Sequence, residues 1–303
     1  MMVESTRTPS VTPHTFGRVT VLVADNGGVL PYGNSVVVRG SERTMVIDPS
    51  LALQPHTVTA DLAFLSHGHE DHIAGLRHFD VPTYTHHLDV AAVSSLDALV
   101  AQFGLPPHAH NEAVRDLHEE YGIPRRRDGV IGVDDGHVFN LGDVTATVVH
   151  LPGHTPGHCG VLVEPDGFFY VGDIDLTSFG PMYGDVDSSA DDFLVSMDRV
   201  AATEARWYGT FHQKGVISGA DEFRERLGAY RAKLFERERR LLEFLDQPRT
   251  LAEIVAHRLV YRPHVTAPYV EPVEQRVAEQ HLERLVEAGD VAASAEGKFA
   301  RTV

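Results

Sequence analysis

The segment His67-Gly68-His69-Glu70-Asp71-His72 places three imidazoles and a carboxylate within six residues. Side chains two positions apart on an extended segment point the same way, so His67 and His69 can bind one ion. Asp71 and His72 follow closely and can face a second position nearby. Imidazole nitrogen and carboxylate oxygen suit zinc, and also iron or manganese, better than calcium or magnesium. The spacing therefore predicts a transition-metal site rather than a run of surface histidines.

The residues on either side of this segment predict the elements that hold it. Leu62-Ala63-Phe64-Leu65 is a short apolar run suited to a buried parallel strand. Ile73-Ala74-Gly75-Leu76 is typical of the first turn of a helix. We therefore expect the first two histidines at the end of a strand, and Asp71 and His72 at the N-terminus of a helix.

Further candidate ligands occur later in the chain, in three segments that each end or begin a strand-like run. They are Leu151-Pro152-Gly153-His154-Thr155-Pro156-Gly157-His158, Phe169-Tyr170-Val171-Gly172-Asp173 and Phe211-His212, and an earlier strand-like run is Met45-Val46-Ile47-Asp48. With the first motif, this series resembles the metallo-β-lactamase superfamily, and more closely its glyoxalase II-like hydrolases. The resemblance covers about residues 15–235.

The resemblance implies two divalent metal ions, typically zinc, with iron or manganese as alternatives. The implied ligands form two sets around a shared aspartate: His67, His69 and His154 for one ion, Asp71, His72 and His212 for the other, and Asp173 as the bridge. Asp71 can also accept a hydrogen bond from a bridging hydroxide and orient it. Asp48 would support the site without binding metal. His158 fits hydrogen bonding behind the ligands better than ligation.

Two other residues near these motifs have alternative interpretations. Asp175 would point to the same side as Asp173 and could orient a ligand or substrate, but a solvated loop carboxylate fits equally well. Tyr183 could reach over the metals and donate to a developing oxyanion, as loop tyrosines do in some lactonases of this superfamily. An ordinary loop aromatic is the more frequent case. His86 and His87 lack partners in motif spacing and are expected at the surface.

Composition limits the class of protein. The chain has 303 residues, a formal net charge of -17 and one cysteine, which excludes an internal disulfide and fits a reducing compartment. Residues 1–15 are polar and lack the apolar core of a signal peptide, and no stretch is long and apolar enough for a membrane span. These features predict a soluble cytoplasmic protein without a membrane partner. The negative charge disfavours nucleic acid as a partner.

The pattern of elements predicts a catalytic domain over residues 1–240. Short strand-like runs at 18–24, 35–39 and 44–47 precede the first motif, as expected for one half of a four-layer αββα sandwich of mixed α and β structure. Residues 87–127 are helical in pattern, with an apolar stripe from Val90 to Phe103. Because this segment lies between the metal motifs, we expect a cap over one side of the cleft that selects the substrate.

Residues 245–303 predict a small second domain. A long helix is expected over 223–244, the capping box Thr250 to Glu253 opens another, and a third covers about 273–288 before a terminal hairpin. Three helices and a hairpin resemble the winged-helix appendage of the lactamase-beta-like branch of the superfamily. The third helix carries five glutamates against two arginines, the wrong balance for reading DNA. We therefore expect a packing or homodimerisation element.

The resemblance and the residues together favour a dinuclear metal-dependent hydrolase. In this interpretation a bridging hydroxide attacks the carbonyl of a small ester, thioester or lactone, so the substrate is a small acyl compound. The runner-up is a metal-dependent endoribonuclease or phosphodiesterase, since related proteins with a similar appendage cut RNA. A third alternative is a mononuclear iron enzyme resembling the persulfide dioxygenases.

Overall fold

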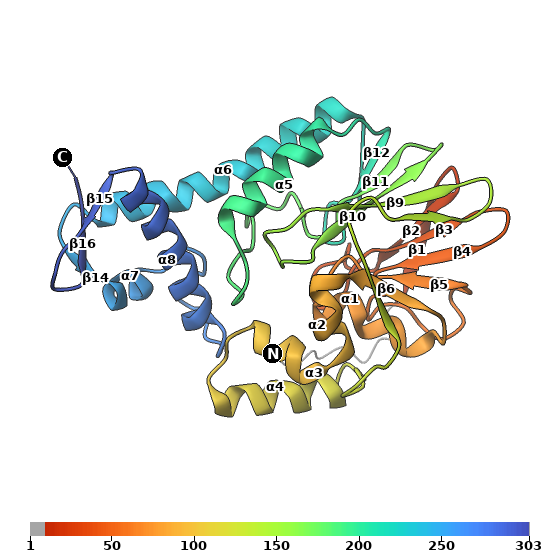
Figure 1. Cartoon of the computed structure of the whole chain (residues 1–303), viewed down its shortest axis with the longest axis horizontal. Coiled ribbons are helices and arrows are strands. Elements are labelled where there is room, and N and C mark those ends of the chain that lie inside the picture. The colour runs from red at the N-terminus through yellow and green to blue at the C-terminus, as the bar shows by residue number, and fades with distance from the viewer. Residues whose placement is uncertain (1–9, 303) are drawn as a thin grey trace.

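The computed structural model describes residues 10–302 and contains two β-sheets packed face to face (Figure 1). The polar residues 1–9 lie outside the described part. The first sheet has its seven strands in chain order: β1 Val11–Phe16, β2 Val19–Ala24, β3 Ser35–Arg39, β4 Thr44–Ile47, β5 Leu62–Phe64, β6 Thr83–His86 and β7 Val130–Val133. Pairing is antiparallel from β1 to β4 and parallel from β4 to β7. The parallel half carries the first metal motif at the end of β5.

The second sheet contains six strands in the order β13-β12-β11-β10-β9-β8. Their bounds are β8 Val138–Asn140, β9 Thr145–His150, β10 Cys159–Glu164, β11 Phe168–Tyr170, β12 Trp207–Gly209 and β13 Val216–Ser218. β11 and β12 pair in parallel, so a crossover must connect them, and α5 (Ala190–Ala202) lies within it. The loop between β11 and α5 carries Asp173, Asp175 and Tyr183.

Three apolar layers hold the two sheets and their helices together. Val36 and Phe64 face the second sheet, whereas Val37, one position along β3, faces the helices outside the first sheet. Those helices are α1 Glu70–Ile73, η1 Ala74–His78, η2 His87–Asp89, α2 Val90–Ser94, α3 Leu96–Gln102 and α4 Pro107–Glu119. The third layer packs α5 and α6 (Ala220–Phe244) on the second sheet. The result is the predicted sandwich of two sheets between helices.

The segment expected to form a cap is broken at Ser95. This residue is extended, with φ -145° and ψ 123°, and its hydroxyl accepts a hydrogen bond from the N–H of Ala98, which starts α3. Val93, Leu96 and Val100 are buried on the outer side of the first sheet. Most of the segment therefore forms part of the outer helical layer, and Phe103 within it lies with its ring centroid 5.9 Å from that of His69.

His86 is buried, contrary to the expectation of a surface histidine. It is 3% exposed, and its ring stacks on that of His150 with centroids 4.0 Å apart and planes 6° apart. His87 is exposed, as expected, and its Nδ1 lies 2.7 Å from a carboxylate oxygen of Asp134. Two adjacent histidines thus have different environments, because the strand β6 ends between them.

The C-terminal elements are joined to the sandwich by α6, which runs from one to the other (Figure 1). They are β14 Arg249–Thr250, α7 Leu251–His257, α8 Val270–Glu287, β15 Val291–Ala293 and β16 Lys298–Arg301, with the sheet order β14-β16-β15. The predicted capping box is present at Thr250 and Glu253. Among the described residues, no helix is long and apolar enough to span a membrane.

Candidate metal centre

The first motif lies where the sequence places it, at the end of a buried parallel strand. After β5 ends at Phe64, the chain turns through His67 and His69, and α1 begins at Glu70 with His69 as its N-cap residue. The rings of His67 and His69 lie with centroids 4.5 Å apart, so both face the same region. The local structure therefore directs the histidines and Asp71 toward one region.

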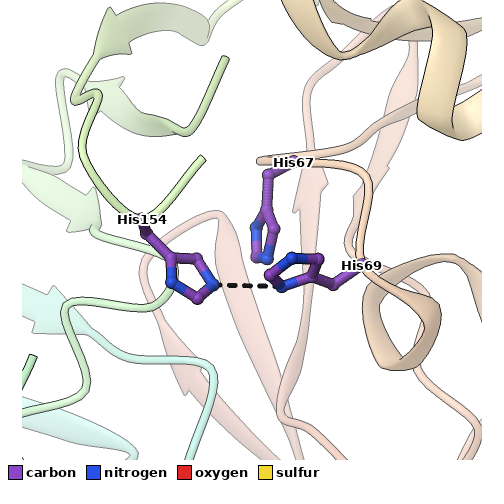
Figure 2. A group of neighbouring side chains, drawn as sticks. All are labelled: His67, His69 and His154. Carbon is purple, nitrogen blue, oxygen red and sulfur yellow. Dashed lines mark hydrogen bonds between the residues drawn. The ribbon is translucent and has the colours of Figure 1, made fainter. Parts of the chain in front are cut away.

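His154 completes a group of three imidazoles (Figure 2). It comes from the loop after β9, on the second sheet, and its Nε2 lies 3.1 Å from Nδ1 of His69. One ring nitrogen from each of His67, His69 and His154 lies within 4.8 Å of the others, and all three side chains are buried. The two sheets thus contribute to a single cluster.

Asp71, His72 and His212 form a second group with the same spacing. A carboxylate oxygen of Asp71 lies 3.1 Å from Nε2 of His212. Asp173 lies between the two groups: its carboxylate oxygens are 3.0 Å from Nε2 of His72 and 3.3 Å from Nε2 of His154. All seven residues proposed from the sequence as ligands therefore converge, in two groups joined by Asp173.

All five histidines have their outward-facing nitrogen held by an oxygen outside the cluster. These hydrogen bonds join His67 Nδ1 to the hydroxyl of Ser66 at 3.1 Å, His69 Nε2 to Asp185 at 2.8 Å, His72 Nδ1 to Asp48 at 2.8 Å, His154 Nδ1 to the carbonyl of Met182 at 2.8 Å, and His212 Nδ1 to the carbonyl of Gly28 at 2.7 Å. A proton on the outer nitrogen leaves the lone pair of the inner nitrogen facing the cluster. This is the tautomer that binds metal.

Asp48 fixes the position of the His72 ring. Its carboxylate accepts hydrogen bonds from Nδ1 of His72, from the backbone N–H of Ser66 at 2.7 Å and from the hydroxyl of Tyr170 at 2.6 Å. The ring of His72 also stacks on Phe211, with centroids 3.6 Å apart. His72 is therefore fixed both in its plane and along its hydrogen bond.

His158 and Asp175 act on the backbone of the proposed ligands. Nδ1–H of His158 donates to the carbonyl of Leu151 at 2.8 Å, and its Nε2 accepts from the backbone N–H of Asp173 at 3.0 Å. Burial lowers the pKa of His158 to about 3, so the ring stays neutral. Asp175 accepts a hydrogen bond from the backbone N–H of His212 at 3.1 Å. Burial, and then the charge of Asp173, raise the pKa of Asp175 to about 8.

Tyr183 packs as an ordinary loop aromatic, the more frequent of the two cases, and not over the cluster as the alternative of an oxyanion donor requires. The side chain is fully buried, and its hydroxyl lies 2.9 Å from Nε2 of His281 on α8. Nδ1 of the same histidine lies 3.1 Å from a carboxylate oxygen of Glu238 on α6. Tyr183 therefore joins its loop to α6 and α8.

Two carboxylates that sequence reasoning missed also position the site. Asp185 holds His69, as given above, and lies twelve residues after Asp173 on the same loop. Asp89 accepts hydrogen bonds from the N–H of Gly68 at 3.0 Å, the hydroxyl of Thr155 at 2.8 Å and the N–H of Gly157 at 2.9 Å. It thereby ties the first histidine motif to the loop of His154. Neither aspartate lies in a distinctive local pattern, and only the folded chain brings them to their partners.

The unpaired atoms of the cluster fit a cation. Nε2 of His67, Nε2 of His72 and Oδ1 of Asp173 are buried without a hydrogen-bond partner among the described residues, although the last two atoms lie only 3.0 Å apart. Buried polar atoms are rarely left unpaired, so these atoms point to a partner of another kind. Burial lowers the pKa of His67 well below its usual value, so its imidazole is neutral and able to bind metal. The donor set of imidazoles and carboxylates suits a divalent transition metal.

The chain is similar in sequence to a known family and to several known proteins. Residues 28–212 match the family model of the metallo-beta-lactamase superfamily. The acyl-coenzyme A thioesterase MBLAC2 of Gallus gallus is 28% identical over 189 residues, covering 55% of this chain and 66% of that protein. The hydroxyacylglutathione hydrolase GloC of Haemophilus influenzae is 28% identical over 115 residues, covering 36% of this chain and 47% of that protein. The chain thus spans less than two thirds of the length of these relatives.

A solved structure shares the fold over nearly the whole chain. The metallo-beta-lactamase family protein of Thermus thermophilus superimposes with a TM-score of 0.64 and 22% sequence identity, covering 97% of each chain. Its match extends beyond the sandwich, so the C-terminal elements belong to the shared fold as well.

Proposed function

The chain belongs to the metallo-beta-lactamase superfamily, and from this premise we propose that it is a hydrolase that uses two divalent metal ions. The observation that carries the proposal is the convergence of the seven side chains in two groups around Asp173, with inner atoms that lack hydrogen-bond partners. The proposed ligands are His67, His69 and His154 for one ion, Asp71, His72 and His212 for the other, and Asp173 for both. Zinc is the expected metal, with iron or manganese as alternatives.

Two bound cations would lower the pKa of a shared water toward neutrality and polarise the carbonyl that this water attacks. The protein's own residues supply the geometry. Asp71 can accept a hydrogen bond from the attacking water and orient it. Asp48, Asp185 and the two backbone carbonyls hold the imidazoles so that their lone pairs stay directed inward. His158 keeps the backbone of Asp173 in place.

Among small esters, thioesters and lactones, we favour a thioester as the substrate. The relative named above is a thioesterase that acts on acyl-coenzyme A, and this supports the choice. Tyr183, which could have donated to the oxyanion as loop tyrosines do in some lactonases, is buried against His281 instead. The main competing function is hydrolysis of a phosphodiester in RNA.

The proposal is tested by assaying an acyl-coenzyme A thioester, an aryl ester, a lactone and a short RNA side by side. We expect thioester hydrolysis that a chelator abolishes and added zinc restores, and that Asp173→Asn lowers severely. Asp187→Asn, an exposed residue of the same loop, serves as the control. RNA cleavage without thioester turnover would refute the proposal. Metal analysis provides a second test, since a single iron per chain contradicts a dinuclear hydrolase.

For residues 245–303 we propose a winged-helix module that packs against the catalytic domain and does not read DNA. The order β14, α7, α8, β15, β16 with one three-stranded sheet supports this assignment. In α8, Glu274 is buried and its carboxylate accepts the backbone N–H groups of Leu259, Val260 and Tyr261. Arg276 and Gln280 donate to the carbonyls of Gly184 and Tyr183. Glu274, Arg276 and Gln280 of this helix are thus engaged within the protein.

A further inference from the structure

A cavity of about 510 Å³ lies beside α6, and none of the seven proposed ligands lines it. Its walls come from α6, from the segment between α7 and α8, and from the loop that follows Asp173. The lining side chains that matter here are basic or aromatic: Phe179, Lys233, Arg237, Arg240, Tyr261 and Arg262. This combination differs from the acidic character of the chain as a whole.

The lining is positively charged in a protein whose formal net charge is -17. Four basic side chains line the cavity against one acidic side chain, Glu236. Glu236 pairs with Lys233 at 2.6 Å. Within residues 10–302, Arg237, Arg240 and Arg262 form no salt bridge with a carboxylate. Arg240 and Arg262 thus lack a carboxylate partner at the cavity, and the largely buried Arg237 adds positive charge to its wall.

Backbone carbonyls hold two of these guanidinium groups in place without neutralising them. Arg237, only 5% exposed, donates to the carbonyls of Phe179, at 2.8 Å, and Pro181. Arg240 donates to the carbonyls of Arg258 at 3.0 Å and Leu259 at 3.2 Å. A cation that is held rigidly and lacks a carboxylate partner is preorganised to bind an anionic ligand, and guanidinium groups match phosphate oxygens particularly well.

Two aromatic rings lie next to these charges. Phe179 is 44% exposed, and its centroid is 5.9 Å from that of Tyr261. The guanidinium carbon of Arg237 lies 5.5 Å from the centre of the Phe179 ring. Exposed aromatic faces bind nucleobases by stacking, and arginines beside them bind the phosphates. The cavity therefore fits a phosphorylated nucleotide better than a simple anion or an apolar group.

α6 connects this cavity to the metal centre. The hydroxyl of Tyr230 on α6 donates to the backbone carbonyl of Asp173 at 3.2 Å. Lys233, Arg237 and Arg240 follow Tyr230 by three, seven and ten residues, and this spacing keeps them on one side of the helix. At the rise of an α-helix they lie roughly 4.5, 10 and 15 Å farther along the axis. The basic side chains thus form a row that leads away from Asp173.

We propose that this cavity binds the phosphorylated adenine nucleotide of a coenzyme A thioester whose acyl carbonyl lies at the metal centre. This inference rests on the proposed thioesterase function. In coenzyme A, a flexible arm with two amide groups separates the thioester from an adenosine that carries phosphates at its 3′ and 5′ positions. The row along α6 likewise places the arginines at a distance from Asp173, so the two ends of one such molecule can lie at the cavity and at the metal centre. The arginines bind the phosphates, and Phe179 and Tyr261 contact the adenine.

The first test measures binding of adenosine 3′,5′-bisphosphate to the full chain by calorimetry. We expect binding that Arg262→Ala weakens about tenfold or more, since the variant loses a charge-assisted contact. Arg262 is exposed, and its guanidinium makes no hydrogen bond within the described residues, so the variant should fold normally. The control is Arg239→Ala, which removes the same charge from α6 at an exposed residue paired with Glu243. No binding, or equal weakening by both variants, would overturn the assignment.

The second test compares one acyl group carried on coenzyme A and on pantetheine, which lacks the nucleotide. We expect the wild type to have a higher kcat/KM for the coenzyme A thioester, and Arg262→Ala to lower the ratio of the two values about tenfold. Equal use of both thioesters would overturn the cavity assignment and leave the proposed thioesterase intact. If neither thioester is hydrolysed, the proposed function fails, whereas binding of the bisphosphate still supports the cavity. Binding of a short RNA in preference to the bisphosphate counts against the proposal.

Discussion

At the scale of single residues, Asp185 shows how one carboxylate outside the metal motifs controls a proposed ligand. It holds Nε2 of His69 at 2.8 Å, which leaves Nδ1 facing the cluster. We expect Asp185→Ala to lower metal affinity about 10- to 100-fold, because the imidazole loses its orientation. Competition with a chromophoric chelator measures this affinity. Asp187→Ala is the matched control on the same loop, and equal affinities of the two variants would contradict the role of Asp185.

Tyr183 gives the opposite prediction, because its hydroxyl serves the packing and not the chemistry. Tyr183→Phe leaves Nε2 of the fully buried His281 without its partner. We expect a loss of about 1–2 kcal/mol in the free energy of unfolding, with kcat nearly unchanged. Denaturant unfolding and steady-state kinetics check both quantities. A fall in kcat of about a hundredfold at unchanged stability would restore the role of an oxyanion donor.

His86 predicts a pH dependence of stability that does not involve the metal centre. Burial, and then the neighbouring His150, lower the pKa of His86 to about 4 from its usual value of 6.5. The unfolded chain therefore binds a proton here at a higher pH than the folded chain does. The contribution of His86 to the free energy of unfolding is therefore fully present above pH 6.5 and is lost as the pH falls toward 4.

We expect His86→Asn to flatten this pH dependence, because asparagine does not titrate in this range. Its amide oxygen can still accept the hydrogen bond from the N–H of Leu88 that the imidazole now accepts. Urea unfolding at several values between pH 4 and 7 measures the slope. His264→Asn, at an exposed histidine between α7 and α8, is the control. An unchanged slope in His86→Asn would show that this histidine does not titrate as described.

The residues that could be found from the sequence are those in local patterns. The spacing of the first motif located four of the seven residues that converge, and the resemblance to the superfamily implied the other three, His154, Asp173 and His212. Asp89 and Asp185 could not be found in this way, because their partners lie 21 or more positions away. The partner of the Tyr183 hydroxyl could not be found for the same reason, because His281 lies 98 positions later.

At the scale of elements, Asp89 in η2 fastens two loops that come from different sheets. Its carboxylate accepts three hydrogen bonds, from Gly68, Thr155 and Gly157. Asp89→Ala leaves three buried donors unpaired, so we expect a loss of about 3 kcal/mol or more in the free energy of unfolding. Denaturant unfolding tests this, with Asp97→Ala as a control at an exposed carboxylate. A loss no greater than that of the control would show that the loops need no such link.

The elements themselves were largely predictable where local patterns decide them. The strands at 35–39 and 44–47 and the capping box at Thr250 have the expected bounds. The helical stripe from Val90 to Phe103 is interrupted, because Ser95 is held extended by its bridge to Arg126. α8 begins at Val270, earlier than expected, because Pro272 is tolerated in the first turn of a helix. Pairing between distant segments decided what the local pattern could not.

At the scale of the whole molecule, the C-terminal elements share one apolar core with the sandwich. A continuous cluster extends from Phe169 and Phe193 through Leu234 and Leu241 of α6 to Leu282 of α8. We therefore expect a single cooperative unfolding transition for the full chain, measured by calorimetry. A chain that ends at residue 244 should aggregate or unfold, because its share of this core is exposed. Two separate transitions would show that residues 245–303 fold on their own.

The spread of the seven proposed ligands along the chain has a consequence for how the protein is made. They extend from His67 to His212, and the two groups draw on both sheets. A zinc finger collects its ligands from a short stretch and can fold around the metal. Here most contacts that build the site are distant in sequence, a property that slows folding. The complete set of seven therefore comes together only after both halves of the sandwich have been synthesised and have packed against each other.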